Sequence, residues 1–318
     1  MADTAERSLD LFWSAGNKYY LASNTSSDWA QYWPRAHALD VLTDAYLRNP
    51  STALKDRMTD LLTGVRIKNF GSLINNYYDD MQWMALACLR AYSATSDNRF
   101  KGVTDTLWAD IKNGWSSDLG GGIWWRKDNP SKNTPSNMPA AILAARLYKI
   151  GGNSADLQWA QKIYDWERST LYEPATGLVY DNIDNNGNKN TSWKFTYNQG
   201  TFLGAALELY ENTGSSLYLS DALQAADYTL NSGMLTSNGL LKDEGGGDEG
   251  TLQGNLRSLF HPTHRGGQLR PFQKKRLRKF SPGQRRKPLE QGHQQDQRPV
   301  RQRTGTRPPA VRRTLLPS

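Results

Sequence analysis

The chain has 318 residues and a formal net charge of +8, which is concentrated near its C-terminal end. Residues 251–318 hold 17 Lys and Arg against 2 Asp and Glu, whereas residues 1–250 hold 22 against 29, with all 11 tryptophans and all 15 tyrosines. The single cysteine, Cys88, excludes an intrachain disulfide, and the lone histidine of this acidic body, His37, argues against a metal site built from His and Cys.

The N-terminal segment reads MADTAERSLDLFW, without the basic region and apolar run of a signal peptide. No signal peptide is therefore visible, and we expect either a cytoplasmic protein or a chain from which a leader is missing. No apolar run is long enough to cross a bilayer, so we also expect no membrane span.

Apolar residues recur with helical spacing through the body, most clearly in the stripes at 38–46, 81–92, 157–164 and 219–230. We expect Asn49-Pro50 to end the first helix, Ser154 to cap the third and Gly233 to end the fourth. With the segments between these stripes, the periodicity predicts roughly ten helices.

The linkers between these helices alternate in character. Short ones such as RNPS at 48–51 are plain turns, whereas those at 118–137, 182–200 and 240–254 are long and rich in Gly, aromatic and acidic residues. Long loops in a compact helical protein tend to be functional. The pattern predicts an all-α fold, an α/α toroid of helical hairpins whose long loops share one face. A helical bundle or solenoid is the alternative, although no fixed repeat period is present.

Two aspartates stand side by side within residues 75–92, which read NNYYDDMQWMALACLRAY. One interpretation is a capping box, in which Asp79 caps a helix and Gln82 follows three residues later. The other is catalytic, because retaining glycosidases need two carboxyl groups about 5–5.5 Å apart. Like charges in proximity also raise one pKa, so that one group stays protonated while the other is ionised.

Tryptophans next to glycine supply a second indication. Trp124 and Trp125 follow a triple glycine, which allows the backbone to approach a ligand closely. Flat aromatic faces suit the apolar faces of sugar rings, while Asp and Asn suit the hydroxyl groups. Most of the tryptophans are expected in the core, but those in the polar loops favour a binding role.

Several motifs together resemble glycoside hydrolase family 76, the α-1,6-mannanases. They recur in order across residues 1–254: QYWPRAHALDVLTDAYLR, YYDDMQWMALA, GGGIWWRKDNPSKNTPSN, FTYNQGTFLGAALELY and DEGGGDEGTLQG. The resemblance implies an (α/α)6 toroid and retaining hydrolysis of α-1,6-linked mannan with no metal or other cofactor. It implies that Asp79 and Asp80 are the catalytic pair, and of the two we expect Asp79 to be the nucleophile and Asp80 the acid/base. Residues in the matching motifs are the implied substrate contacts: Tyr78, Trp124, Trp125, Asn137, Tyr197, Asn198, Gln199, Asp248 and Glu249.

The resemblance is expected to end after Gly254, which divides a hydrolase domain at 1–254 from a basic tail at 255–318. One interpretation of the tail is a disordered basic arm. Another is translation out of frame, because codons compatible with 255–269, read one nucleotide later, can encode the amphipathic helix that the toroid needs there. The toroid would then be incomplete at its C-terminal end.

Three other functions remain open from the sequence. One is a catalytically inactive, carbohydrate-binding or cell-wall-associated protein on the same scaffold, and another is nucleic-acid binding by the tail. The third is a related toroidal lyase or epimerase, although those reactions usually need His or Tyr as the base. We expect no nucleic-acid partner, because the body shows no basic pattern to match. Family members tend to be secreted or located at the cell surface, whereas this chain shows no leader.

Overall fold

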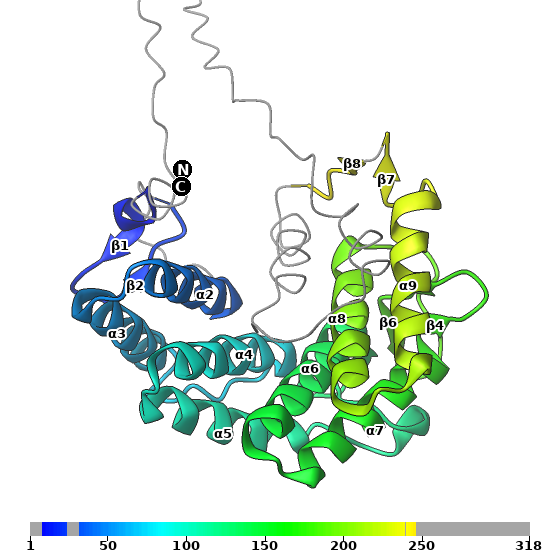
Figure 1. Ribbon diagram of the computed structural model, residues 1–318, viewed down its shortest axis with the longest axis horizontal. Helices are drawn as coiled ribbons and strands as arrows, with labels where there is room; N and C mark the ends of the chain where they lie inside the picture. The colour runs from blue at the N-terminus through cyan, green and yellow to red at the C-terminus, as the bar shows by residue number, and fades with distance from the viewer. Residues whose placement is uncertain (1–7, 24–31, 239, 246–318) are drawn as a thin grey trace, which may run out of the picture. The chain divides into compact units, whose positions relative to one another are not determined.

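The computed structural model describes residues 8–23, 32–238 and 240–245 (Figure 1). The predicted boundary at Gly254, the tail, Asp248 and Glu249 lie outside these ranges. Eight α-helices lie within them, and they follow one another as four hairpins. The helices are α2 Tyr32–Arg48, α3 Thr52–Lys68, α4 Tyr78–Thr95, α5 Asn98–Lys112, α6 Thr134–Gly151, α7 Ser154–Thr170, α8 Thr196–Thr213 and α9 Ser216–Asn231.

Short antiparallel strand pairs and two turns of 3-10 helix occupy the connections. The strands are β1 Trp13–Ser14, β2 Tyr19–Tyr20, β3 Ser131–Asn133, β4 Tyr172–Glu173, β5 Leu178–Val179, β6 Asn182–Asp184, β7 Thr236–Ser237 and β8 Leu240–Leu241. They pair as β1-β2, β3-β6, β4-β5 and β7-β8. The 3-10 turns are η1 Asp10–Phe12 and η2 Asp118–Gly120. The described residues therefore form an all-α architecture with small sheet elements at the loops, as the sequence predicts.

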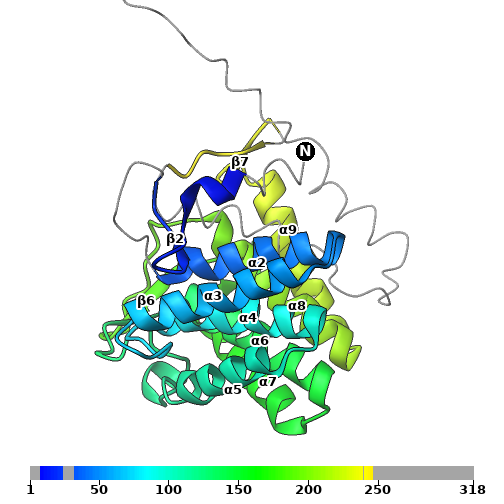
Figure 2. The same ribbon diagram turned by 90° about the vertical axis from the view of Figure 1, so that its left-hand side faces the viewer.

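The helices form two layers. The inner helices α2, α4, α6 and α8 pack against one another in succession, and α3, α5, α7 and α9 each pack against the inner helix of their own hairpin (Figures 1 and 2). The inner helices are the more deeply buried ones, and Met81, Met84 and Cys88 of α4 are fully buried. The apolar stripe of the second predicted helix is thus part of the buried core. No helix in the described ranges is long and apolar enough to span a membrane.

The ends of the helices follow the sequence signals with one exception. Helix α2 stops at Arg48, just before Asn49-Pro50, and Gly233 follows the end of α9 with a φ of 70°. The prediction for Ser154 is wrong by one residue, because the Asn153 side chain accepts the hydrogen bond from the Ala155 N–H at 3.1 Å. Asparagine is as good an N-cap as serine, so the two neighbours compete for the position.

Short and long connections lie at opposite ends of the hairpins. Turns of two or three residues join the two helices of each hairpin, whereas the long loops lead into the N-termini of α4, α6 and α8. Strands β3 and β6, from two of these loops, pair with each other, and residues 76–78 pair with residues 125–127. The long loops therefore meet at one end of the hairpins, as predicted.

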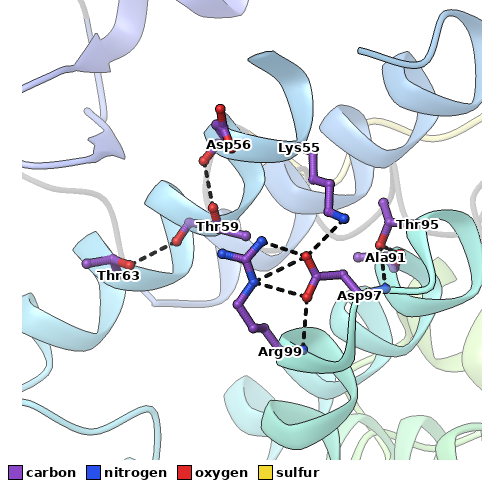
Figure 3. A network of polar contacts seen from close by, with 8 residues as sticks. All are labelled: Lys55, Asp56, Thr59, Thr63, Ala91, Thr95, Asp97 and Arg99. Carbon is purple, nitrogen blue, oxygen red and sulfur yellow. Dashed lines mark hydrogen bonds and ion pairs between the residues drawn. The ribbon is translucent and has the colours of Figure 1, made fainter. Parts of the chain in front are cut away.

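At the other end, Asp97 joins the outer helices α3 and α5 (Figure 3). Its carboxylate accepts hydrogen bonds from the Arg99 backbone N–H at 3.0 Å and from the Arg99 guanidinium, and it pairs with Lys55 of α3 at 3.2 Å. Asp97 is thus the N-cap of α5 and an ion-pair partner for the neighbouring hairpin. The Arg99 guanidinium holds the pKa of Asp97 well below its usual range.

We expect Asp97→Ala to lower the free energy of unfolding by about 0.5–2 kcal/mol, the usual cost of losing an N-cap. A depressed carboxyl pKa gives stability that is present above the unfolded-state pKa, about 3.9, and is lost as the pH falls below it. Urea unfolding at pH 7 and pH 3 should therefore show a smaller difference between wild type and variant at pH 3. Asp105→Ala, which removes an exposed carboxylate paired with Lys101 on the same helix, is the control and should cost less. If the free energies of unfolding of wild type and Asp97→Ala differ more at pH 3 than at pH 7, this assignment is contradicted.

Candidate functional site

Two loop segments come together at the start of α4. The Tyr78 N–H donates to the Trp125 carbonyl at 2.9 Å, and the Lys127 N–H donates to the Asn76 carbonyl at 3.0 Å. These bonds fix the chain direction so that α4 begins at Tyr78, with Asp79 and Asp80 in its first turn. The positive end of the helix dipole at this position favours negative charge.

The two aspartates have different hydrogen-bond partners, and both are half-buried. Asp79 accepts from the Trp125 indole N–H through Oδ2 at 3.0 Å and from the Asp80 backbone N–H through Oδ1 at 2.9 Å. Asp80 accepts from the Asn75 side-chain amide through Oδ2 at 3.0 Å. Both Asp79 oxygens are therefore held by N–H donors.

The capping-box interpretation is excluded by these contacts. The N-cap position of α4 is Tyr77, which makes no side-chain cap, and Asp79 lies inside the first turn. The Gln82 amide donates to the Ser136 carbonyl of α6 at 2.7 Å instead of returning to the start of its own helix. The acid pair is thus not explained by helix capping.

The electrostatic environment shifts the titration of the pair. Burial and the neighbouring Asp80 charge raise the pKa of Asp79 well above its ordinary value, while the N–H donors from Asp80 and Trp125 act in the opposite direction. Two carboxyl groups this close titrate as a unit, so the first deprotonation suppresses the second. The pair can therefore keep one proton at a pH at which an isolated aspartate would have lost it.

An aromatic and cationic surface adjoins the pair. The half-buried Trp125 ring meets Tyr77 edge-on, with centroids 5.5 Å apart, and the Arg126 guanidinium lies 4.9 Å from the Trp125 ring. Tyr77 is 37% exposed, whereas Tyr78 is buried against Gly114, where an added Cβ would come within 2.8 Å of the Tyr78 ring. Tyr77 is therefore better placed than Tyr78 to meet a ligand.

The glycine-rich loop is held from inside by Lys132. This side chain is fully buried, and its ammonium donates to the Ser116 hydroxyl, the Asp118 carbonyl and the Gly121 carbonyl at 2.9, 2.7 and 2.6 Å. It also lies 4.5 Å from the Trp124 ring centroid. Burial lowers the pKa of Lys132 to about 8. One buried cation thus ties the two ends of the loop together.

Trp124 and two of the three glycines, Gly121 and Gly122, are packed against side chains of the protein itself. Trp124 is 7% exposed and packs in the core under Lys132. Gly122 has a φ of 89°, and an added Cβ would lie 2.6 Å from the Trp166 ring. The close backbone approach that the glycines allow therefore accommodates a buried tryptophan, and only Trp125 of the adjacent pair reaches the carboxylates.

Asn137 is also buried, with its amide fully engaged. Its Oδ1 accepts from the Ile123 N–H at 2.7 Å, and its Nδ2 donates to the carbonyls of Ile123 and Asn133 at 3.0 and 2.9 Å. These contacts position the strand-like segment that carries Trp124 and Trp125. A positioning role fits Asn137 better than the expected substrate contact.

The remaining predicted residues gather at the N-terminus of α8. The Tyr197 hydroxyl and the Asn198 amide donate to Asp181 Oδ1 at 2.8 and 3.0 Å. The Gln199 side chain is oriented so that its amide nitrogen donates to the Gly177 carbonyl at 3.0 Å and its oxygen accepts from the Val179 N–H at 2.8 Å. All three are buried, so they organise the loop before α8 around Asp181.

Four residues of the site were not singled out from the sequence: Asn75, Tyr77, Arg126 and Asp181. Asn75 and Tyr77 flank the acid pair within the same motif, and Arg126 follows Trp125 directly. Proximity in sequence is thus the signal that could have found them. Asp181 carries no such signal, because its partners come from α8. No group of three or more His, Cys, Asp and Glu able to hold a metal ion occurs in the part of the chain that the structure describes.

Comparison with known proteins gives a consistent result. Residues 1–281 match the family model described as Glycosyl hydrolase family 76, and this match continues past Gly254, where we expected the resemblance to end. The GH76A α-1,6-mannanase of Salegentibacter sp. HEL1_6 is 40% identical, with a TM-score of 0.82 over 88% of this chain and 84% of that chain. This similarity confirms the toroidal fold.

Two further relatives bear on chemistry. An inactive variant of the same mannanase, in which two consecutive aspartates are replaced by asparagines, forms a complex with α-1,6-mannotriose; it is 39% identical, with a TM-score of 0.82 over 88% of this chain and 84% of that one. Mannan endo-1,6-alpha-mannosidase DCW1 of Saccharomyces cerevisiae is 39% identical over 114 residues, which are 33% of this chain and 25% of that protein. The chain spans between 25% and 50% of the length of the first three curated relatives that it matches.

Proposed function

The chain belongs to glycosyl hydrolase family 76, and from this premise we propose that it hydrolyses α-1,6-mannosidic linkages in mannan, with Asp79 and Asp80 as the catalytic pair. The observation that carries the proposal is the adjacent acid pair in the first turn of α4, held by Trp125 and Asn75. A related mannanase was inactive when two consecutive aspartates were replaced, and it formed a complex with an α-1,6-mannooligosaccharide.

In the proposed reaction, Asp79 Oδ attacks the anomeric carbon of the mannosyl residue while Asp80 protonates the departing glycosidic oxygen. The covalent mannosyl-enzyme is then hydrolysed by a water molecule that Asp80 deprotonates, so the product keeps the α configuration. The two N–H donors to Asp79 favour its ionised form, as a nucleophile requires. Burial and the Asp80 charge raise the pKa of Asp79, so the proposed roles require that substrate binding leaves the shared proton on Asp80.

Trp125 has two roles in this proposal. Its indole N–H orients Asp79, and its half-buried ring, together with Tyr77, offers an apolar face to the sugar beside the scissile bond. Tyr197, Asn198, Gln199 and Asn137 are proposed to hold the surrounding loops in place. Asp248 and Glu249 remain proposed substrate contacts, since their positions lie outside the described residues.

The test uses the full chain and an unbranched α-1,6-mannan, with product anomers followed by ¹H NMR from the first minutes of the reaction. We expect the α anomer to appear first and the β anomer only later, by mutarotation. Matched α-1,2- and α-1,3-linked mannooligosaccharides should remain intact. Initial release of the β anomer would exclude the retaining mechanism. Binding of α-1,6-mannan without any turnover would instead identify a carbohydrate-binding protein on the same scaffold.

A further inference from the structure

One tryptophan differs from all the others that the structure describes. Trp193 is 55% exposed, whereas the remaining described tryptophans are buried or half-buried. It lies in the long loop between β6 and α8. An indole exposed to solvent forgoes the free energy that burial of its apolar surface would supply, so an exposed tryptophan on a long loop is a candidate for binding a ligand.

The backbone around Trp193 is held in place by hydrogen bonds. The N–H groups of Ser192 and Trp193 donate to the Asn190 side-chain oxygen at 3.0 and 3.1 Å. The Asn190 N–H in turn donates to the Asn182 carbonyl of β6 at 2.9 Å. The exposed ring therefore starts from a fixed backbone, which reduces the entropy lost when a ligand is bound.

Trp193 also continues a series of aromatic rings that leads into the protein. Its centroid lies 6.2 Å from that of Phe195, which stacks on Tyr197 at 5.1 Å with an interplanar angle of 14°. The Tyr197 hydroxyl donates to the buried Asp181 carboxylate at 2.8 Å. The exposed end of this series is thus supported by residues of the candidate site.

Backbone pairings place Trp193 at the same end of the hairpins as the acid pair. The Trp125 N–H donates to the Ser131 carbonyl, β3 pairs with β6, and β6 is bonded to Asn190. Paired segments lie about 4.8 Å apart, so three such steps place the Asn190 backbone roughly 14 Å from that of Trp125. At that separation Trp193 is positioned to meet a different sugar of the same chain from the one that Asp79 attacks.

We propose that Trp193 forms a separate mannosyl-binding subsite that stacks on a ring of α-1,6-mannan away from the scissile bond, so that the protein favours long chains over short oligosaccharides. This inference rests on the proposed function. The occupant is a sugar because the loop that carries this indole is polar, with Asn185, Asn186, Asn188, Ser192 and Lys194 near Trp193 in the sequence. A protein partner would require a contiguous apolar patch of several hundred Å².

The inference predicts a length-dependent effect of Trp193→Ala. We expect kcat/KM on long α-1,6-mannan to fall about tenfold, mainly through KM, because one aromatic stacking contact is lost. Turnover of the shortest oligosaccharide that is cleaved should stay within about twofold, since it does not reach the subsite. Trp193→Tyr, which keeps a flat ring, should recover most of the loss. Ile150→Ala removes another exposed apolar side chain, from the last turn of α6, and should have no effect.

Calorimetric binding of mannooligosaccharides of increasing length, in an Asp79→Asn, Asp80→Asn background, separates this inference from the catalytic one. In the Asp79→Asn, Asp80→Asn protein, affinity should rise with the length of the mannooligosaccharide. With Trp193→Ala added, it should rise less. Equal length dependence in both proteins, with the wild type active, overturns the Trp193 subsite alone. A wild type that neither cleaves nor binds α-1,6-mannan overturns the proposed function and the subsite together.

Discussion

Asp79→Ala is expected to lower kcat on α-1,6-mannan by about 10⁴-fold or more, because removing the proposed covalent nucleophile leaves only binding and polar stabilisation. Asp80→Ala is expected to lower it by about 10²–10⁴-fold, the usual contribution of a general acid/base. Asp128→Ala is the matched control, since Asp128 is exposed on the same loop as Trp125 and pairs only with Arg126 among the ion pairs described. It should keep nearly full activity.

Sodium azide distinguishes the roles of the two aspartates. With an aryl α-1,6-mannobioside, whose leaving group needs no proton, azide should restore turnover of both variants. Asp79→Ala should yield the β-mannosyl azide, because azide attacks from the face that the nucleophile had occupied. Asp80→Ala should yield the α-mannosyl azide, because azide displaces Asp79 from the covalent intermediate. The opposite pairing of products would reverse the assignment of nucleophile and acid/base.

Lys132→Met is expected to produce the largest loss of stability. Methionine retains most of the volume but removes the cation from the Ser116, Asp118 and Gly121 oxygens. Because buried acceptors would lose a charged donor, the free energy of unfolding should fall by about 3–5 kcal/mol. Urea unfolding at pH 7 measures this change, and Lys127→Met, which removes a partly exposed lysine paired with Asp110, is the control.

The same Lys132 variant tests whether the loop positions Trp125. If the loop relaxes, Trp125 moves away from Asp79, and kcat should fall even at temperatures where the variant remains folded. A variant that unfolds at much lower urea but keeps wild-type kcat would limit Lys132 to a structural role. A variant of unchanged stability would show that the three oxygens find other donors.

Local signals were enough to predict the hairpins and the acid pair. The apolar stripe at 81–92 is a property of one helix, and the long loops differ in composition from the short turns. The contact between Asp79 and Trp125 joins residues far apart in sequence, yet the motif resemblance predicted both as site residues. Periodicity and composition thus identified the face on which the site lies.

Burial of individual loop residues could not be predicted in the same way. Trp124 and Trp125 are neighbours in a polar loop, but an extended backbone sends successive side chains to opposite faces. One therefore packs under Lys132, and the other reaches Asp79. Likewise, Asn137 binds Ile123 across the glycine-rich loop, a contact that depends on how the loop folds back. Helical spacing has no bearing on either outcome.

The two-residue turns have a practical consequence. Gly152 and Gly214 end α6 and α8 in the left-handed conformation, at the end of the hairpins opposite to the long loops. A fluorophore or an immobilising linker attached at Ser215, whose side chain makes no cap hydrogen bond, would therefore leave the carboxylates facing the solution. Polymeric ligands could then be captured on a sensor surface without the support obstructing them.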